Sequence, residues 1–272
     1  MSQNRSLLQL RRITKIFSKG TIDEVTALDN INLDVNAEDY ITIIGSNGAG
    51  KTTVLNIIAG VFPPERGGKV IVNGTDITGL SEYKHATDVG RVYQDPHIGT
   101  AAKMTIEENL AMAVLRGQPR SLRPASDKQR RELFRSALAP LGLGLENRLS
   151  AQVGTLSSGQ RQAVALVMAT ISKPALLLLD EHTANLDPRT AQIVLDLTEI
   201  IVQREKMTTV MVTHNMELAL RYGNRLIMMH EGRIVVDLNQ EQRAGLTIND
   251  LITAFEKASG RKFDEDNALL TP

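Results

Sequence analysis

A glycine-rich turn between an apolar run and a helical segment constrains the fold of this chain more than any other feature. Residues 40–44 are mainly apolar and lead into Gly45, which is the pattern of a buried strand. Residues 52–59 follow the turn with a helical pattern. Strand, tight turn and helix in this order begin an α/β unit, so we expect a mainly parallel sheet with helices on its faces.

The rest of the chain alternates between strand and helix patterns. The other predicted strands are residues 7–10, 31–35, 69–72, 91–93, 176–179, 208–212 and 225–229. The other predicted helices are residues 105–141, broken by Gly117, Pro119 and Pro124, residues 158–171, residues 188–204, and a last helix that begins in a capping box at 247–250 and ends near Gly260. We expect one domain over residues 1–240 with a helical subdomain inserted at about 97–171, and then a short C-terminal helix and tail at 241–272.

Residues 45–52 match the phosphate-binding P-loop pattern without a mismatch, and a chance glycine-rich turn is the alternative. Glycines let the backbone wrap closely around phosphate oxygens, and their amides together with the helix N-terminus attract an anion. Lys51 would reach the β- and γ-phosphates of ATP, and the Thr52 hydroxyl would bind Mg²⁺. The predicted ATP-binding residues here are Gly45, Ser46, Asn47, Gly48, Ala49, Gly50, Lys51, Thr52 and Thr53.

Two carboxylates follow the apolar strand predicted at 176–179. Ligands of parallel sheets bind at the carboxyl ends of the strands, where Asp180 and Glu181 lie in sequence. Asp180 is suited to holding Mg²⁺ through water, and Glu181 is suited to orienting and polarising the attacking water. Acidic residues also end strands simply because loops are exposed, so the pair gains its meaning from the P-loop upstream.

A serine- and glycine-containing segment lies about 20 residues before the two carboxylates. It consists of Leu156, Ser157, Ser158, Gly159 and Gln160. Together with the P-loop and the Asp-Glu strand end, it resembles the signature motif of the ABC (ATP-binding cassette) ATPases, and the resemblance extends over about residues 7–236. Ser158 replaces one glycine of the pair in that motif, and as a good N-cap it should preserve helix capping next to the γ-phosphate.

This resemblance implies a P-loop NTPase fold of the ABC type, with a mainly parallel core, an N-terminal antiparallel β subdomain and the inserted helical subdomain. It assigns Gln94 to the Q-loop, as a catalytic residue that touches Mg²⁺ or water, and His214 to a catalytic contact with the γ-phosphate. Leu186 and Asp187 correspond to the D-loop, which crosses the dimer interface. Phe17 lies where the family stacks an aromatic ring on adenine, with a core phenylalanine as the alternative.

His182 stands where most family members carry proline. With residues 93–96 and 224–232, it makes the chain similar to a smaller branch, the PhnK-like ATPases, which pair with a single permease and a binding lipoprotein. Some of these are suspected importers of tryptophan or tyrosine. We expect His182 to be a variation in an exposed loop, and a direct catalytic role is the alternative.

In this family two chains complete each other's sites. The resemblance implies a homodimer in which Ser157, Ser158 and Gly159 of one subunit close over the ATP held by the other. It further implies integral membrane permease subunits, indirectly a substrate-binding protein, and a peripheral location on the cytoplasmic face of the inner membrane. The alternative is a soluble ABC assembly ATPase, such as an iron–sulfur cluster scaffold component, and a third possibility is a degenerate ATP-binding module without catalysis.

Composition excludes several other functions. The chain has no cysteine, which excludes disulfides, thiolate metal sites and cysteine nucleophiles. A formal net charge of +0 does not favour nucleic-acid binding. The basic residues between 116 and 135 are typical of a solvated helix face, with contact to an acidic partner or lipid head groups as the alternative. No apolar run reaches the roughly 18 residues of a spanning helix, so we expect any membrane role to come through a partner.

Overall fold

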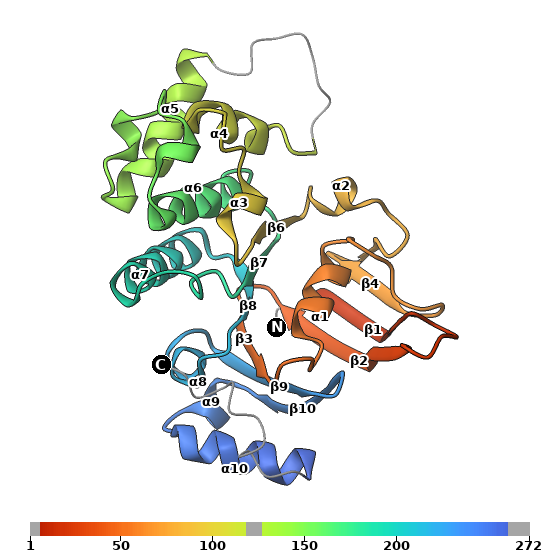
Figure 1. Ribbon diagram of the computed structural model, residues 1–272. Helices are drawn as coiled ribbons and strands as arrows, with labels where there is room; N and C mark the ends of the chain where they lie inside the picture. Colours follow the sequence, from red (N-terminus) through yellow and green to blue (C-terminus); the bar gives the residue numbers. More distant parts are fainter. Residues whose placement is uncertain (1–5, 118–126, 261–272) are drawn as a thin grey trace, which may run out of the picture. The chain divides into compact units, whose positions relative to one another are not determined.

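The computed structural model describes residues 6–117 and 127–260 and divides into two compact units. The first unit combines Met1–His85 with Met207–Pro272, and the second is Ala86–Lys206 (Figure 1). The chain therefore leaves the first unit once and returns to it. Each unit is described by itself below.

An antiparallel sheet forms one part of the first unit. Its strand order is β2 (Val25–Asn36), β1 (Ser6–Phe17), β4 (Lys69–Val72) and β5 (Thr75–Asp76). The β1 side chains of Leu8, Leu10 and Ile13 are fully buried, whereas the residues between them are partly exposed. Strands β1 and β2 are longer than predicted because their outer positions are polar and alternate with the apolar ones, which weakens the sequence pattern without preventing pairing.

Parallel strands form the other part of the first unit. Strand β3 (Tyr40–Gly45) is buried along its whole length and pairs in parallel with both β8 (Thr208–Val212) and β9 (Arg225–His230). Strand β10 (Arg233–Leu238) returns antiparallel to β9 and was not predicted, because its residues are only half-buried and lack a clear alternation. The glycine-rich turn follows β3 and leads into helix α1 (Lys51–Ile58), as predicted.

The C-terminal helix packs onto this parallel part of the first unit. Helix α10 (Ile248–Ser259) begins in a capping box between Thr247 and Asp250 and ends at Gly260 with φ +71°, which confirms the predicted helix. It buries Leu251 and Phe255 in a cluster with residues of β9 and of α8 (Met216–Arg221). Two short helices complete the unit, α2 (Glu82–His85) and α9 (Gln240–Arg243).

The second unit is mainly helical around two parallel strands. Strand β6 (Val89–Val92) pairs with β7 (Leu176–Asp180), which is buried along its whole length. The helices are α3 (Pro96–Gly99), α4 (Ile106–Val114), α5 (Lys128–Leu138), α6 (Ser158–Thr170) and α7 (Pro188–Glu205), with 3₁₀ turns at Ala139–Leu141, Leu145–Asn147 and Val153–Thr155. Helix α6 is buried almost throughout, so it forms the centre of this unit.

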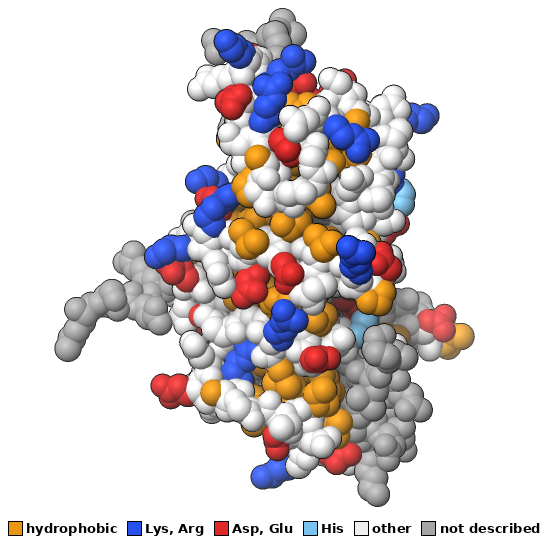
Figure 2. Space-filling model, turned by 90° about the vertical axis from the view of Figure 1, so that its left-hand side faces the viewer, with side chains coloured by type: hydrophobic (Ala, Val, Ile, Leu, Met, Phe, Trp, Pro, Cys, Tyr) orange, Lys and Arg blue, Asp and Glu red, His pale blue; other side chains and the backbone are white. Residues whose placement is uncertain are grey.

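Helix α7 illustrates how these helices divide between core and solvent. It buries Val194, Leu195 and Ile201, whereas Ile193 and Ile200 are 40% and 48% exposed. Figure 2 shows hydrophobic side chains scattered among acidic and basic ones on the side of the molecule that bears this helix. Isolated apolar side chains of this kind are ordinary for a protein surface.

The basic residues predicted to lie on a solvated helix face fall largely on α5. Of these, Lys128, Arg130 and Arg135 are exposed or half-exposed, and Arg131 donates to Glu107 at 2.8 Å. Arg120 and Arg123 lie outside the described residues. Among the residues that the structure describes, no helix has the length and apolar character needed to cross a bilayer.

Candidate active site

Close backbone approaches explain the glycines at both ends of the P-loop. A Cβ atom on Gly45 would lie 2.2 Å from the Met229 carbonyl oxygen on the neighbouring strand. A Cβ atom on Gly50 would lie 2.5 Å from the Ala27 carbonyl oxygen, and Gly50 also has φ +95°, where side chains are strained. The loop therefore forms a backbone cradle at the N-terminus of α1, and a phosphate fits there because amides and the helix dipole favour an anion.

The Lys51 side chain binds back to the backbone of the loop that precedes it. Its Nζ donates to the carbonyl oxygens of Gly45 at 2.7 Å and Ser46 at 2.9 Å, and the residue is only 6% exposed. The Ala49 carbonyl oxygen accepts from the Gly232 amide at 3.2 Å, which attaches the loop to the β9–β10 hairpin. These hydrogen bonds give the loop a defined shape. The next residue, Thr52, exposes its side chain on the first turn of α1.

Phe17 ends strand β1 and is 38% exposed, so it is not a core phenylalanine. Its ring meets that of Phe62 edge-on, with centroids 5.4 Å apart. The Lys15 Nζ atom lies 5.6 Å from the Phe17 centroid and 5.0 Å from the Phe62 centroid. A partly exposed ring held by a second ring and a cation can offer its free area to a flat ligand such as adenine.

His214 lies between the end of β8 and the start of α8. The Asn215 side chain caps α8 by accepting from the Leu218 amide at 3.0 Å, and Thr213 Oγ1 accepts from the Asn215 amide at 3.1 Å. These two hydrogen bonds fix the backbone on both sides of the histidine. His214 is half-buried at the carboxyl end of a parallel strand, where ligands of such sheets bind.

In the second unit, Asp180 is the last residue of β7 and is 7% exposed. Its Oδ2 accepts from Arg91 Nη2 at 2.7 Å, and the two side chains are 9% and 8% exposed. Sequence analysis missed Arg91, although a basic residue inside a strand made otherwise of valine and glycine was an available signal. A carboxylate in this setting is buried with its charge already compensated.

Glu181 follows with φ +46°, which places a non-glycine residue in the left-handed region. Such a conformation costs free energy and persists only where the surroundings hold it. The side chain is half-buried, directly after the strand end. The backbone at Glu181 is therefore constrained by its neighbours.

His182 is buried, at 2% exposure, so its expected place in an exposed loop was wrong. Its Nε2 lies 3.1 Å from Thr198 Oγ1 on α7. Because Thr198 Oγ1 donates its proton to the Val194 carbonyl oxygen at 2.7 Å, it accepts from the imidazole, and Nε2 carries the histidine proton. Burial lowers the pKa of His182 to about 4, which keeps the ring neutral. The sequence could not reveal that α7 covers this position.

The signature segment opens helix α6 with a capping box. Ser157 Oγ accepts from the Gln160 amide, and Gln160 Oε1 accepts from the Ser157 amide, both at 3.3 Å. The helix cap is therefore Ser157, and the expectation that Ser158 provides it was wrong, because Ser158 is already the first helical residue. Both serines are exposed at the helix N-terminus, whereas Leu156 and Gly159 are buried.

Gly159 is buried against helix α7. A Cβ atom there would lie 2.1 Å from Thr190 Cγ2, so only glycine fits without a shift. Thr190 also donates its amide to Asp187 Oδ1 at 3.1 Å, which makes Asp187 the N-cap of α7. Hydrogen bonds from Thr190 lower the pKa of Asp187. Leu186, the other predicted D-loop residue, is half-buried just before this cap.

Gln94 comes two residues after strand β6 ends at Val92, which is one residue earlier than predicted. Its carbonyl oxygen accepts from Asn185 Nδ2 at 3.5 Å, so the predicted Q-loop contacts the predicted D-loop. The preceding Tyr93 carbonyl oxygen accepts from Gln162 Nε2 at 3.1 Å, which ties the same segment to α6. The second unit thus brings Gln94, Asp180, Glu181, the D-loop and the signature segment into one structure, and the first unit holds the P-loop, Phe17 and His214.

The side chains predicted to bind Mg²⁺ have suitable chemistry. A threonine hydroxyl, an aspartate carboxylate and a glutamine amide present the hard oxygen ligands that this ion prefers. The described residues contain no group of three or more histidines, cysteines or acids that could form an all-protein cage.

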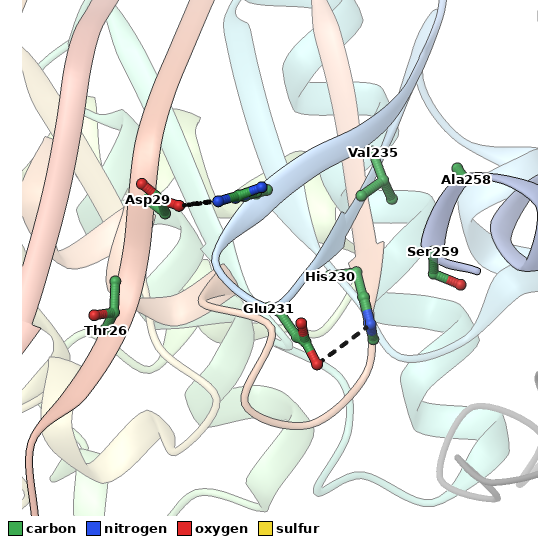
Figure 3. A pocket seen from close by; sticks show the side chains of 8 residues that line it. Thr26, Asp29, His230, Glu231, Val235, Ala258 and Ser259 are labelled. Atoms are coloured by element: carbon green, nitrogen blue, oxygen red, sulfur yellow. Dashed lines mark hydrogen bonds and ion pairs between the residues drawn. The ribbon is translucent and has the colours of Figure 1, made fainter. Parts of the chain in front are cut away.

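A separate hollow of about 430 Å³ lies in the first unit, beside the β9–β10 hairpin and the end of α10 (Figure 3). It is lined by Thr26, Asp29, His230, Glu231, Arg233, Val235, Ala258 and Ser259. Its charged side chains pair with one another, Arg233 Nε with Asp29 at 2.8 Å and His230 Nε2 with Glu231 at 3.8 Å. None of the predicted nucleotide-site residues lines it.

The family model and the similar proteins all indicate the same class of ATP-binding protein. The family model described as "ABC transporter" matches residues 28–184. The chain is 40% identical over 252 residues to a tyrosine transport ATP-binding protein of Clostridioides difficile (strain R20291), covering 93% of this chain and 100% of that protein. It is 35% identical over 232 residues to the lipoprotein-releasing system ATP-binding protein LolD of Oleidesulfovibrio alaskensis, covering 83% of this chain and 94% of that protein.

A solved structure is similar over most of the chain. It is the dimeric post-hydrolysis state of the ATP-binding cassette MJ0796 bound to ADP and Pi, with a TM-score of 0.73 and 26% identity. The alignment covers 86% of this chain and 98% of that one. The fold is thus that of an α/β P-loop NTPase with parallel and antiparallel strands, as predicted.

Proposed function

We propose that this chain, which belongs to the ABC transporter family of ATP-binding proteins, powers the import of a small solute, with an aromatic amino acid as the favoured class. The chain is an ATP-hydrolysing subunit of a transporter. The observation that carries the finer proposal is the 40% identity to a tyrosine transport ATP-binding protein along that protein's whole length. Three other relatives, named for methionine import or lipoprotein release, are 34% to 36% identical.

The proposed ATP site combines residues of the P-loop with those that follow three strands. Lys51 would contact the β- and γ-phosphates, exchanging its present carbonyl acceptors for phosphate oxygens. Thr52, Asp180 and Gln94 would hold Mg²⁺, which supplies neutralisation of the phosphate charge when bound. Phe17 would stack on the adenine ring.

Hydrolysis requires a positioned water and a contact to the γ-phosphate. Glu181 would orient and polarise the water as general base, and its unusual backbone angle supports a role in which the carboxylate is aimed precisely. His214 would contact the γ-phosphate from the end of β8. Both assignments concern residues at the carboxyl ends of parallel strands.

We further propose that two copies of the chain form a homodimer. The exposed Ser157 and Ser158 and the N-terminus of the 13-residue helix α6 would face the γ-phosphate of ATP held by the other copy, with Gly159 behind them. The similar solved cassette is described as dimeric, which supports this arrangement. Leu186 and Asp187 would lie at the interface.

The partners and location follow from the same proposal. The ATPase would dock on integral membrane permease subunits at the cytoplasmic face of the cell membrane, and a substrate-binding protein would deliver the solute on the other side. The PhnK-like branch, with a single permease and a binding lipoprotein, is the favoured assignment. An iron–sulfur scaffold function is not favoured, because the similar curated proteins are transporter subunits.

The test is reconstitution with candidate permease subunits from the same organism. We expect co-purification, vanadate-sensitive ATPase activity, and ATP-dependent uptake of tyrosine or tryptophan into proteoliposomes when the cognate binding protein is present. Lys51→Ala should abolish uptake and ATP binding, whereas Lys69→Ala, which alters only an exposed ion pair with Asp76, serves as the matched control. Uptake of methionine but of no aromatic amino acid would overturn the substrate class and leave the ATPase assignment standing.

A further inference from the structure

A buried ion pair joins the carboxylate at the end of β7 to the neighbouring strand. Arg91 lies on β6, which runs parallel to β7 with Arg91 opposite Leu178 and Val92 opposite Leu179. Its guanidinium reaches along the strand to Asp180, with a distance of 2.7 Å between Nη2 and Oδ2. Both side chains are less than a tenth exposed. Removing either partner would take an opposite charge away from the other in a poorly solvated place, so the two charges depend on each other.

The guanidinium also lies near an aromatic ring. The Arg91 Cζ atom lies 4.5 Å from the Tyr93 ring centroid, which is a favourable cation–π distance. Tyr93 is two residues further along the chain, directly after β6 ends at Val92. The aromatic ring fixes the plane of the guanidinium and thereby the position of the donor that Asp180 accepts.

The same segment is tied to the signature helix. The Tyr93 carbonyl oxygen accepts from Gln162 Nε2 at 3.1 Å, and Gln162 is 1% exposed. Gln162 lies on α6, two residues after the Gln160 of the capping box. Successive contacts therefore connect Asp180 through Arg91 and Tyr93 to the helix that begins with the signature segment.

We propose that Arg91 is a positioning residue that acts as an internal counter-cation for Asp180, competes with Mg²⁺ for that carboxylate, and so links metal binding to Tyr93 and helix α6. This inference rests on the proposed role of Asp180 in holding Mg²⁺. A carboxylate that already carries a guanidinium attracts a second cation less strongly, because the positive charges repel each other at short range in a poorly screened site. Mg²⁺ binding then weakens the Arg91 contact, and Tyr93 carries that change to α6.

Competition by Arg91 predicts the direction in which metal affinity changes when the arginine charge is removed. Arg91→Met keeps an unbranched side chain that can lie on the Tyr93 ring but removes the charge. We expect its Mn²⁺ affinity, measured by electron paramagnetic resonance titration in the presence of ADP, to rise about 5-fold or more, the lower end of typical coupling between two sites. Arg131→Met removes a different arginine of the same unit that pairs with Glu107 and should leave the Mn²⁺ titration unchanged.

A second readout concerns the protein without metal. Arg91→Met should lower the thermal unfolding midpoint of the metal-free protein, since Asp180 loses its buried partner. Addition of Mg²⁺ and ADP should then raise the midpoint more in Arg91→Met than in the parent chain, because the metal replaces the missing charge. A purely structural role for Arg91 would lower both midpoints equally, and that result would contradict the proposal.

Two further variants keep the test decisive. Tyr93→Leu leaves both charges in place but removes the ring next to the guanidinium, so this variant should also bind Mn²⁺ more tightly. If Arg91→Met does not fold, Tyr93→Leu takes its place in the test. Asp180→Asn separates the two hypotheses. If Asp180→Asn leaves Mn²⁺ binding unchanged, the proposed metal site itself is wrong. If Asp180→Asn weakens binding while Arg91→Met and Tyr93→Leu do not tighten it, only the competition by Arg91 is wrong.

Discussion

His182 donates from Nε2 to Thr198 Oγ1 at 3.1 Å, which fastens the residue after the proposed general base to the middle of helix α7. Glu181 itself has φ +46°, a conformation that needs support from its surroundings. A buried hydrogen bond one residue away provides such support. Because the ring is only 2% exposed, we expect His182 to position the backbone and not to transfer protons.

Removal of the acceptor should therefore affect both stability and catalysis. Thr198→Val leaves the His182 N–H buried without its acceptor, and we expect a loss of about 1–3 kcal/mol in the free energy of unfolding. The turnover number should fall while the KM for ATP changes little, because the general base is displaced and the P-loop is untouched. Urea unfolding and steady-state ATPase kinetics measure the two effects.

Thr253→Val is the matched control for Thr198→Val. Thr253 also donates to a carbonyl oxygen four residues earlier, at 2.8 Å on Asn249, but it is exposed on α10. Its substitution should leave stability and turnover nearly unchanged. If both valine variants behaved alike, the hydrogen bond to His182 would have no special role.

The lowered pKa of His182 predicts an acid-dependent loss of stability. The folded-state pKa is about 4, whereas an unfolded histidine has a pKa of about 6.5. Between these values the unfolded chain binds a proton that the folded chain does not, so stability rises with pH across this window and is lost as the pH falls from about 6.5 toward 4. The full difference corresponds to about 3 kcal/mol.

The measurement is urea unfolding at a series of pH values for the parent chain and for His182→Gln, which keeps an amide donor for Thr198 but cannot titrate. The difference in unfolding free energy between the two chains should narrow or reverse as the pH falls through this window. A constant difference from pH 7 to pH 4.5 would mean that His182 is not kept neutral by burial.

Glu181→Gln should retain ATP binding and lose turnover by about 10²–10⁴-fold, because the carboxamide can hold water but cannot accept its proton. Trapped ATP should then stabilise the dimer, which size-exclusion chromatography detects. Glu217→Gln, an acid in the first turn of α8, is the control and should hydrolyse ATP normally. Normal turnover by Glu181→Gln would remove this residue from its proposed role.

Gly159→Ala should be destabilising for a steric reason. The new methyl group would lie 2.1 Å from Thr190 Cγ2, and overpacking of this kind costs about 1–3 kcal/mol. Thr190→Ser removes that methyl group, so the double variant should recover most of the lost stability in thermal unfolding. Failure of the double variant to recover would place the strain elsewhere on α6 or α7.

The features that sequence analysis predicted well are local ones. Strand β8 was predicted at its observed bounds, and the turn from β3 into α1 follows from glycine spacing within a few residues. The capping box at Thr247 likewise depends on residues three apart. The interactions that cause these features join residues only a few positions apart, so the sequence pattern alone is sufficient to predict them.

The features that it missed depend on residues distant in the chain. Arg91 and Asp180 are 89 positions apart, and only the pairing of β6 with β7 makes them neighbours. The burial of His182 is caused by α7 folding back over it, which no spacing around residue 182 encodes. Strand β10 depends on the hairpin that presents it to β9, since its own residues are only half-buried.

The two carbonyl oxygens that Lys51 already holds have a consequence for the energetics of the nucleotide cycle. An incoming phosphate oxygen replaces one of these carbonyl acceptors. The favourable free energy of the new contact is therefore only the difference between two hydrogen-bonded states of Lys51. When the phosphate leaves, Lys51 can donate again to the Gly45 and Ser46 carbonyl oxygens. Release of ADP therefore does not leave the ammonium group without acceptors, which lowers the free-energy cost of completing each cycle.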